Sequence, residues 1–197
     1  MGLILASASP RRQELLRNAG IDCTVNPANV PEDILPDEPP EVYARRLALA
    51  KARAVFEKHS SDQVLGADTI VVVDDSILGK PADARDAIRM LQLLSGREHR
   101  VITGVCLITP NLTAGQPARE DVRLETTRVT MRSLAKEEVE SYVDDGEPMD
   151  KAGAYAIQGL ASRWIPKIAG CYFNVVGLPV PLVDAMLRAA AVWDFGQ

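Results

Sequence analysis

The sequence predicts an α/β protein built around one sheet-centred core. Apolar runs of strand length alternate along the chain with amphipathic segments of helix length, a pattern typical of α/β sheets. The 197 residues can bury a substantial core, so we expect a single domain over residues 1–197, with two lobes. A composition of 47% hydrophobic and 25% charged residues is that of an ordinary globular protein.

The N-terminal residues predict a strand that leads directly into a helix. Residues 3–6 are apolar and predict a buried strand. Ser9 suits the N-cap of a helix over residues 10–19, and Pro10 suits its first turn, where a missing N–H costs nothing. Gly20 suits the position just after the end of that helix.

The rest of the chain continues the alternation. A second strand is expected over residues 21–26, followed by an acidic, proline-rich loop over residues 27–40. Pro39 and Pro40 then begin a long helix that reaches about residue 59. We expect the later elements to be a strand over 64–73, a helix over 83–94, paired strands over 100–109 and 120–132, a helix over 134–144, a loop over 147–159, strands over 163–168 and 171–176, and a helix over 181–192.

Charge and cysteine content exclude several classes of protein. A formal net charge of −5 without any basic block argues against stable nucleic-acid binding. No apolar run approaches membrane-spanning length, and the N-terminus lacks the basic region of a signal peptide. Three widely spaced cysteines without a CxxC pair indicate reduced thiols. We therefore expect a cytoplasmic protein that does not bind membranes.

Two arginines, Arg11 and Arg12, fall in the first turn of the first predicted helix. Acidic side chains are favoured at that position, because the helix dipole and the unpaired amide groups attract negative charge. The two arginines therefore oppose the dipole unless an anion lies between them. Together with the hydroxyl-rich turn that contains Ser7, they predict a phosphate-binding site.

Asp68 interrupts an otherwise apolar strand, and an unpaired carboxylate there would be costly. The residues alone leave two interpretations open, since Asp68 could cap a helix or end the strand, or it could be functional. Glu32 in the acidic loop and the cations Lys51 and Lys80 favour function. Carboxylates hold Mg²⁺ or Mn²⁺, and lysine and arginine bind phosphate oxygens, so the set predicts a metal-dependent phosphate site.

The residues differ in how strongly they support this hypothesis. Lys51 is also explained by a solvated helix face, whereas Lys80 is fixed in a tight turn between glycine and proline. Gln158 can donate and accept hydrogen bonds at once, so it could read a base edge or simply stabilise a turn. The sequence leaves both interpretations of Gln158 open.

Taken together, several segments make the chain resemble the Maf family of nucleotide pyrophosphatases. They occur in the family's order over nearly the whole chain: ASASPRR (6–12), KAR (51–53), GADT (66–69), GKP (79–81), LSG (94–96), DKAGAYAIQG (150–159) and VGLP (176–179). The resemblance implies a fold like that of inosine triphosphate pyrophosphatases, with a mixed, curved sheet, flanking helices and a cleft between two lobes. It also implies that a nucleoside triphosphate is hydrolysed to the monophosphate and pyrophosphate with a divalent cation.

The resemblance also implies roles for particular residues. Four residues would hold the phosphates: Ser7, Arg12, Lys51 and Lys80. Glu32 would help to bind Mg²⁺ or Mn²⁺, and Asp68 would accept a proton from the attacking water or act as a metal ligand. The catalytic residues expected on this basis are Asp68, Lys51 and Lys80.

Three positions resemble the branch of the family that acts on dTTP and UTP, namely Arg11, Thr69 and Gln158. A neutral amide at residue 158 suits the imide edge of uracil or thymine, which presents carbonyl acceptors and an N–H donor. The alternatives are a pyrophosphatase for 7-methyl-GTP or purine nucleotides, and a non-catalytic nucleotide-binding regulator of cell division. Family resemblance further implies a homodimer.

Overall fold

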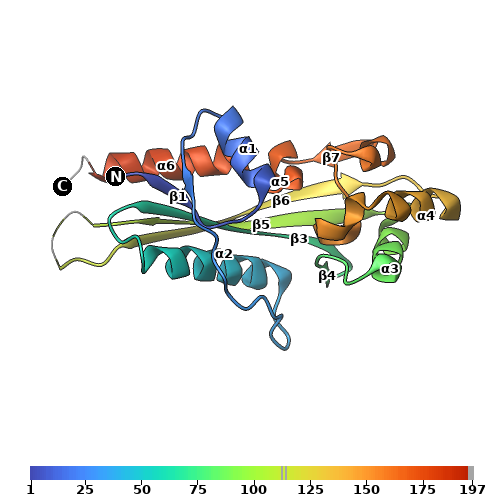
Figure 1. Ribbon diagram of the computed structural model, residues 1–197, viewed down its shortest axis with the longest axis horizontal. Coiled ribbons are helices and arrows are strands. Elements are labelled where there is room, and N and C mark those ends of the chain that lie inside the picture. The colour runs from blue at the N-terminus through green and yellow to red at the C-terminus, as the bar shows by residue number, and fades with distance from the viewer. Residues whose placement is uncertain (112, 114, 195–197) are drawn as a thin grey trace. The chain divides into compact units, whose positions relative to one another are not determined.

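A mixed sheet of seven strands forms the framework of the protein (Figure 1). The computed structural model describes residues 1–111, 113 and 115–194. Six strands follow the order β2-β1-β3-β5-β6-β7, and β4 pairs with β3. Strand β1 is parallel to β2 and β3, whereas β4 and β7 are antiparallel to their neighbours. The predicted α/β class and mixed sheet are confirmed.

Strands and helices alternate along the chain, except that β4 follows β3, β6 follows β5 and α6 follows α5. The strands are β1 (Leu3–Leu5), β2 (Thr24–Val25), β3 (Gln63–Val73), β4 (Ser76–Leu78), β5 (Glu98–Thr109), β6 (Arg119–Thr130) and β7 (Lys167–Ala169). The α-helices are α1 (Pro10–Asn18), α2 (Pro40–Phe56), α3 (Ala84–Leu94), α4 (Lys136–Asp145), α5 (Tyr172–Val176) and α6 (Val180–Asp194). Three 3₁₀ helices, Glu147–Asp150, Ala152–Ala154 and Leu160–Trp164, lie between α4 and β7. No helix in the described part of the chain is long and apolar enough to span a membrane.

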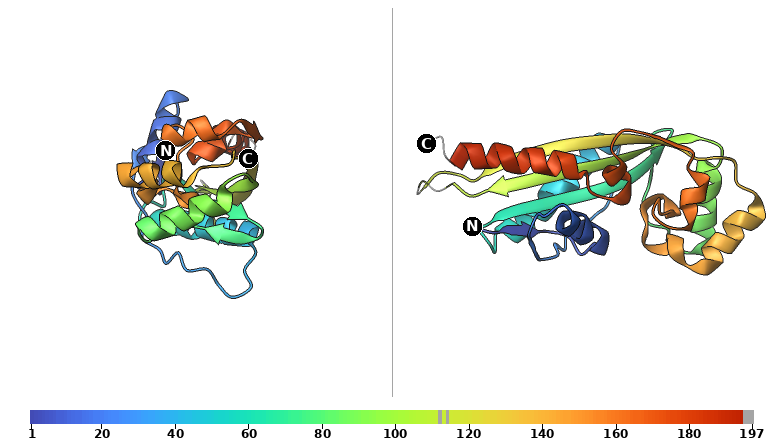
Figure 2. Two further views of the ribbon diagram at one scale, coloured as in Figure 1. Left: turned by 90° about the vertical axis from the view of Figure 1, so that its right-hand side faces the viewer. Right: turned by 90° about the horizontal axis from the view of Figure 1, so that it is seen from above.

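The chain divides into two compact units. Unit 1 comprises Met1–Asp68, Thr103–Glu125 and Gly177–Gln197, and unit 2 comprises Thr69–Ile102 and Thr126–Val176. In unit 1, α2 and α6 lie on opposite faces of the strands (Figures 1 and 2). In unit 2, α3, α4 and the 3₁₀ segments surround a separate apolar core that includes Trp164.

The backbone at the start of α1 is as the sequence predicts, but the side chain of Ser9 does not cap the helix. Ser9 occupies the N-cap with extended dihedral angles, and Pro10 begins the helix. The Ser9 hydroxyl makes no capping hydrogen bond. Instead, the Ser9 amide donates to Ser7 Oγ at 3.3 Å. Gly20, with a φ of 71°, follows the helix end as predicted.

Helix α2 lies against β3 and β5 at van der Waals distance because each strand carries a glycine there. A Cβ on Gly66 would lie 2.3 Å from the carbonyl oxygen of Ala48, and one on Gly104 would lie 2.1 Å from that of Ala44. The two alanines are one helical turn apart on α2 and are fully buried. Backbone contact with glycine therefore fixes the separation between this helix and the sheet.

The prediction of a strand over residues 171–176 is wrong, because this segment forms helix α5. Its aromatic and β-branched residues favour a strand, but Asn174 is fully buried among them. The Asn174 amide donates to the carbonyl of Val101 at 2.9 Å and to Thr127 Oγ1 at 3.1 Å. These tertiary hydrogen bonds outweigh the local strand preference.

Other element boundaries also differ from the prediction. The strand expected over 163–168 is a 3₁₀ helix followed by the short β7, and that expected over 21–26 is only Thr24–Val25. The sequence analysis missed β4, which returns along β3 after a turn at Asp74 and Asp75. Both aspartates have positive φ (49° and 60°), the conformation that a tight hairpin turn of this kind requires.

His99 is a buried titratable group in the core of unit 2. It is 2% exposed, and its Nε2 lies 2.8 Å from the hydroxyl of Tyr155. Its Nδ1 has no hydrogen-bond partner among the described residues. Burial lowers the pKa of His99 from 6.5 to about 4, so the folded protein holds this imidazole neutral.

We expect His99 to make the protein less stable in mild acid. Between about pH 6.5 and 4 the unfolded chain binds a proton at this residue and the folded chain does not, so stability falls as the pH falls through this window. At about pH 5 the loss relative to neutral pH is about 2 kcal/mol. Urea unfolding of His99→Gln should show a flatter dependence on pH between 5 and 7 than wild type. Equal slopes for His99→Gln and wild type would contradict this assignment.

Candidate active site

Lys51 brings the two predicted carboxylates of unit 1 together. It projects from α2 and is 9% exposed. Its Nζ donates to Asp68 Oδ1 at 2.7 Å and lies 2.6 Å from Glu32 Oε1. Burial excludes the interpretation of Lys51 as part of a solvated helix face. Asp68 does not end its strand, since β3 continues through it to Val73, and its carboxylate accepts from a lysine side chain.

The loop that carries Glu32 is attached to α2 by two side chains one turn apart. The hydroxyl of Tyr43 donates to the carbonyl of Glu32 at 2.8 Å, and Arg46 Nη2 donates to the carbonyl of Asp33 at 2.9 Å. The Arg46 guanidinium also forms a bidentate pair with Glu38, at 2.6 and 2.7 Å. The exposed Glu32 carboxylate is therefore held against Lys51 by contacts on its own backbone.

Tyr43 and Arg46 were missed by the sequence analysis. The available signal was weak, because an acidic loop followed by a helix with polar residues three apart is common in globular proteins. The pKa of Tyr43 is raised to about 12 by burial and by the nearby carboxylates Asp68 and Glu32. The hydroxyl of Tyr43 thus remains a donor at neutral pH.

If a divalent cation binds at Glu32 and Asp68, we expect Tyr43→Phe to weaken its use while leaving the fold intact. Removing one hydrogen bond that holds the backbone of Glu32 should raise the Mg²⁺ concentration for half-maximal activity by about 2- to 10-fold. Titration of activity with Mg²⁺ at saturating nucleotide measures this. Tyr172→Phe, which alters a 40%-exposed tyrosine of unit 2, is the matched control. A Mg²⁺ dependence identical to wild type would show that Tyr43 does not position Glu32.

Ser7 and Arg12 form a second part of the site in unit 1. Arg12 Nη1 donates to Ser7 Oγ at 3.0 Å and to the carbonyl of Ala67 at 2.9 Å, and its Nε donates to the carbonyl of Gly177 at 2.9 Å. Burial lowers the pKa of Arg12, and the negative charge of Asp68 partly offsets that shift. Arg12 thereby connects the N-terminal turn to β3 directly beside Asp68.

The contacts of Ser7 orient its hydroxyl group. Its oxygen accepts from Arg12 and from the amide of Ser9, which uses both acceptor positions of a hydroxyl group. The Ser7 proton is therefore left to be donated to a further acceptor, as binding of a phosphate oxygen would require. Arg11 is half-buried on α1 in the same segment.

The remaining predicted residues lie in unit 2. Thr69 follows Asp68 directly in β3 and is half-buried. Lys80 is exposed in the turn after β4, and the carbonyl of the preceding Gly79 accepts from the amide of Gly153 at 3.0 Å. Gln158 is exposed in a turn closed by a hydrogen bond from the amide of Gly159 to the carbonyl of Ala156.

The carboxylates of unit 1 fit a divalent cation that is completed by substrate. Because both bond the same nitrogen, oxygens of Glu32 and Asp68 lie within a few ångströms of each other. No group of three or more acidic, histidine or cysteine side chains with metal-site geometry occurs in the part of the chain that is described. A cage made only of protein ligands is not needed, since Mg²⁺ is commonly bound by one or two carboxylates together with phosphates and water.

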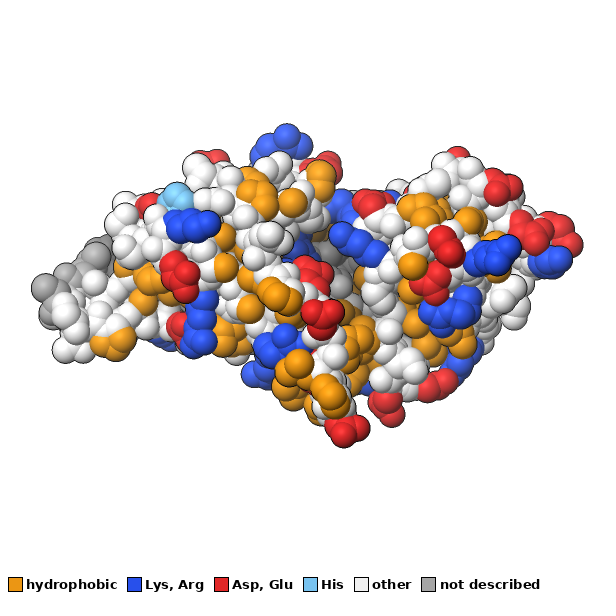
Figure 3. Space-filling view, turned by 60° about the horizontal axis from the view of Figure 1, so that its bottom comes forward, with side chains coloured by type: hydrophobic (Ala, Val, Ile, Leu, Met, Phe, Trp, Pro, Cys, Tyr) orange, Lys and Arg blue, Asp and Glu red, His pale blue; other side chains and the backbone are white. Residues whose placement is uncertain are grey.

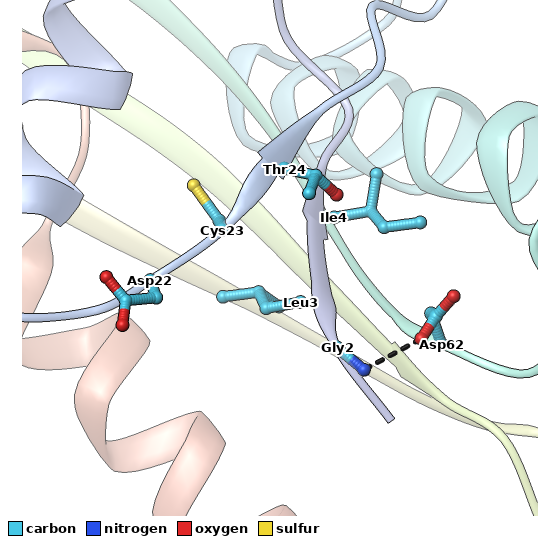
Figure 4. Close-up of a pocket in the computed structure, with 7 residues that line it drawn as sticks. All are labelled: Gly2, Leu3, Ile4, Asp22, Cys23, Thr24 and Asp62. Atoms are coloured by element: carbon cyan, nitrogen blue, oxygen red, sulfur yellow. Dashed lines mark hydrogen bonds between the residues drawn. The ribbon is translucent and has the colours of Figure 1, made fainter.

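A pocket of unit 1 lies elsewhere, beside β1 and β2 (Figure 4). Its lining includes Asp22, Cys23 and Asp62, and Asp62 accepts a hydrogen bond from the amide of Gly2 at 2.7 Å. It contains no lysine or arginine and none of the predicted site residues. Two carboxylates without a cation make it unsuited to a polyphosphate.

Comparisons with known proteins agree with one another over nearly the full length of the chain. A family model described as Maf-like protein matches residues 2–190. A dTTP/UTP pyrophosphatase of Koribacter versatilis is 57% identical over 192 residues, which cover 98% of this chain and 96% of the relative. One of Symbiobacterium thermophilum is 51% identical over 185 residues, covering 94% and 92%.

Among solved structures, a nucleoside-triphosphatase / dITP/XTP pyrophosphatase of Mycobacterium abscessus aligns with 99% of this chain and 97% of its own. The TM-score is 0.44 and the sequence identity is 15%.

Proposed function

Because the chain belongs to the Maf-like protein family, we propose that it hydrolyses dTTP and UTP to the nucleoside monophosphate and pyrophosphate. The observation that carries the proposal is the contact of Lys51 with both Glu32 and Asp68. A protein that only binds a polyanion has no need of two carboxylates at its binding site, because they repel the ligand. A hydrolase that uses a divalent cation needs such carboxylates. The curated relatives named above support pyrimidine nucleotides as the substrates.

In the proposed reaction, Glu32 and Asp68 would hold Mg²⁺ or Mn²⁺ together with the triphosphate. The cation neutralises phosphate charge and polarises the phosphorus–oxygen bonds when it is bound. Asp68 accepts the proton of the water that attacks the α-phosphorus, or serves only as a metal ligand. Lys51 and Lys80 compensate the charge of the departing pyrophosphate.

The N-terminal segment binds the phosphates in this proposal. Ser7 donates its hydroxyl proton to a phosphate oxygen, and Arg12 holds Ser7 in place while adding positive charge. Arg11, Thr69 and Gln158 select the base. The amide of Gln158 offers a donor and an acceptor, which match the carbonyl and N–H groups of uracil or thymine.

The experiment that tests the proposal is pyrophosphate release from UTP, dTTP, CTP, GTP, ATP and 7-methyl-GTP, with Mg²⁺ or Mn²⁺ and with a chelator. Release of pyrophosphate and monophosphate from UTP and dTTP alone, lost with the chelator and restored by the cation, is expected. Turnover of 7-methyl-GTP or purine nucleotides instead would keep the reaction and reject the assigned base. Nucleotide binding without turnover would favour the regulatory alternative.

We propose also that the protein acts in the cytoplasm as a homodimer, without stable nucleic-acid or membrane binding. Basic and acidic side chains are interspersed on the face drawn in Figure 3, and the net charge is −5. Three large apolar side chains of unit 1 are about half exposed: Ile34 (53%), Leu35 (50%) and Val42 (50%). Such a surface suits a second copy of the chain. Sedimentation of the purified protein distinguishes a dimer from a monomer.

A further inference from the structure

A bridge of two side chains holds the turn that carries Gln158. The hydroxyl of Tyr142 donates to Glu147 Oε1 at 2.7 Å and accepts from the amide of Ala156 at 3.2 Å. The other carboxylate oxygen of Glu147 accepts from the amide of Leu160 at 3.1 Å. The bridge therefore binds the turn on both sides of Gln158.

The bridge is itself fixed in the core of unit 2. Tyr142 is 2% exposed and packs edge-to-face on Trp164, with ring centroids 4.8 Å apart. Burial and the bond to Glu147 raise the pKa of Tyr142, so its hydroxyl stays protonated and remains a donor. The position of the hydroxyl is thus set by aromatic packing.

Gly159 gives the carboxylate access to the turn. A Cβ at this position would lie 2.1 Å from Glu147 Oε1 and 2.3 Å from Oε2. The φ of Gly159 is −102°, so the backbone conformation itself is open to other residues and the requirement is for space. Any larger residue would force Glu147 away from the amide of Leu160.

The hydrogen bonds of the turn do not use the side chain of Gln158, which therefore remains available to a ligand. Gln158 is exposed and makes no side-chain hydrogen bond to any residue that the structure describes. Its backbone is constrained through Ala156, Gly159 and Leu160, whereas its amide group is not used by the turn. The turn is therefore stabilised by other groups, and the interpretation of Gln158 as a turn-stabilising amide loses its support.

We propose that Tyr142 and Glu147 are positioning residues that set base selectivity by fixing the turn of Gln158. This inference rests on the proposed function and extends it to residues that do not touch the nucleotide. Selectivity for uracil over cytosine requires that a donor and an acceptor be held in register with the base edge. A turn that can shift would let the amide of Gln158 adapt to cytosine.

The test compares Tyr142→Phe and Glu147→Gln with wild type, using UTP and CTP. We expect each variant to raise the KM for UTP and to lower the UTP-to-CTP ratio of kcat/KM by about tenfold, with kcat for UTP nearly unchanged. In a Gln158→Ala background, Tyr142→Phe should produce no further change in that ratio, because the group being positioned is absent. Tyr155→Phe is the matched control, since it removes a different buried hydroxyl of the same core, the one that contacts His99.

Several outcomes would overturn the inference. These are an unchanged ratio in folded Tyr142→Phe and Glu147→Gln, an equal change in Tyr155→Phe, a persistent effect in the Gln158→Ala background, or a wild type that does not distinguish UTP from CTP. Equilibrium binding of UMP and CMP is measured on the same variants. A wild type without pyrophosphatase activity would reject the proposed reaction, while the UMP-to-CMP affinity ratio would still decide the role of the bridge.

Discussion

Asp68→Asn is expected to reduce pyrophosphate release from UTP and dTTP by a factor of about 10² to 10⁴. The change removes the negative charge that bonds Lys51 and would accept a proton or hold the cation, while the shape of the side chain is kept. Lys51 retains its contact with Glu32, so the buried ammonium group is not left without a partner. We therefore expect a folded protein whose nucleotide affinity changes far less than its rate.

Steady-state kinetics and calorimetric UTP titration, each with Mg²⁺ present, measure the two effects separately. Asp62→Asn is the matched control, because it neutralises another aspartate of unit 1 near the start of β3, where the carboxylate accepts a hydrogen bond from the amide of Gly2. It should retain wild-type kcat. Wild-type turnover by Asp68→Asn would remove Asp68 from the mechanism, and thermal unfolding shows whether a lost rate reflects a lost fold.

Gly66→Ala is expected to destabilise the protein by about 3 kcal/mol or more. The added methyl group would overlap the carbonyl oxygen of Ala48 and lie 2.8 Å from the amide nitrogen of Ala52. These are backbone atoms of α2, so no side chain can rotate away to make room. The helix must move from the sheet, and Lys51 must move with it from Asp68, so activity should fall as well.

Urea unfolding gives the change in stability. Gly2→Ala is the control, because its Cβ would meet only Asp62 Oδ1 at an ordinary 3.5 Å. Gly104→Ala, which would contact the carbonyl of Ala44 on the preceding turn of α2, should resemble Gly66→Ala. A free energy of unfolding for Gly66→Ala within about 0.5 kcal/mol of wild type would show that α2 does not depend on this contact.

The sequence predicted the elements whose pattern is local and strong. The strand before Ser9, the helix after Pro10 and the long helix that begins at Pro40 were all correct, since apolar periodicity and proline at a helix start are local signals. Helix α5 was not predictable in this way. It depends on hydrogen bonds from Asn174 to residues more than forty positions away in the chain, and no local pattern records them.

The candidate site was predictable to a similar extent. A carboxylate in an apolar strand identified Asp68, and its contact with Lys51 shows how the burial of that charge is compensated. Tyr43 and Tyr142, which hold the segments of Glu32 and Gln158, could not be found from the sequence. A tyrosine on an amphipathic helix is ordinarily interpreted as part of the hydrophobic core. Their hydroxyl groups gain a role only when the fold brings a loop against them.

One of the boundaries between the two units falls on the peptide bond between Asp68 and Thr69. Glu32, Lys51 and Asp68 in unit 1 and the residues that hold Gln158 in unit 2 thus belong to separate cores. For laboratory evolution, a library confined to the segment from Tyr142 to Leu160 would search new bases without perturbing the packing around Lys51. A family built in this way can diversify its substrates while it inherits one hydrolytic apparatus.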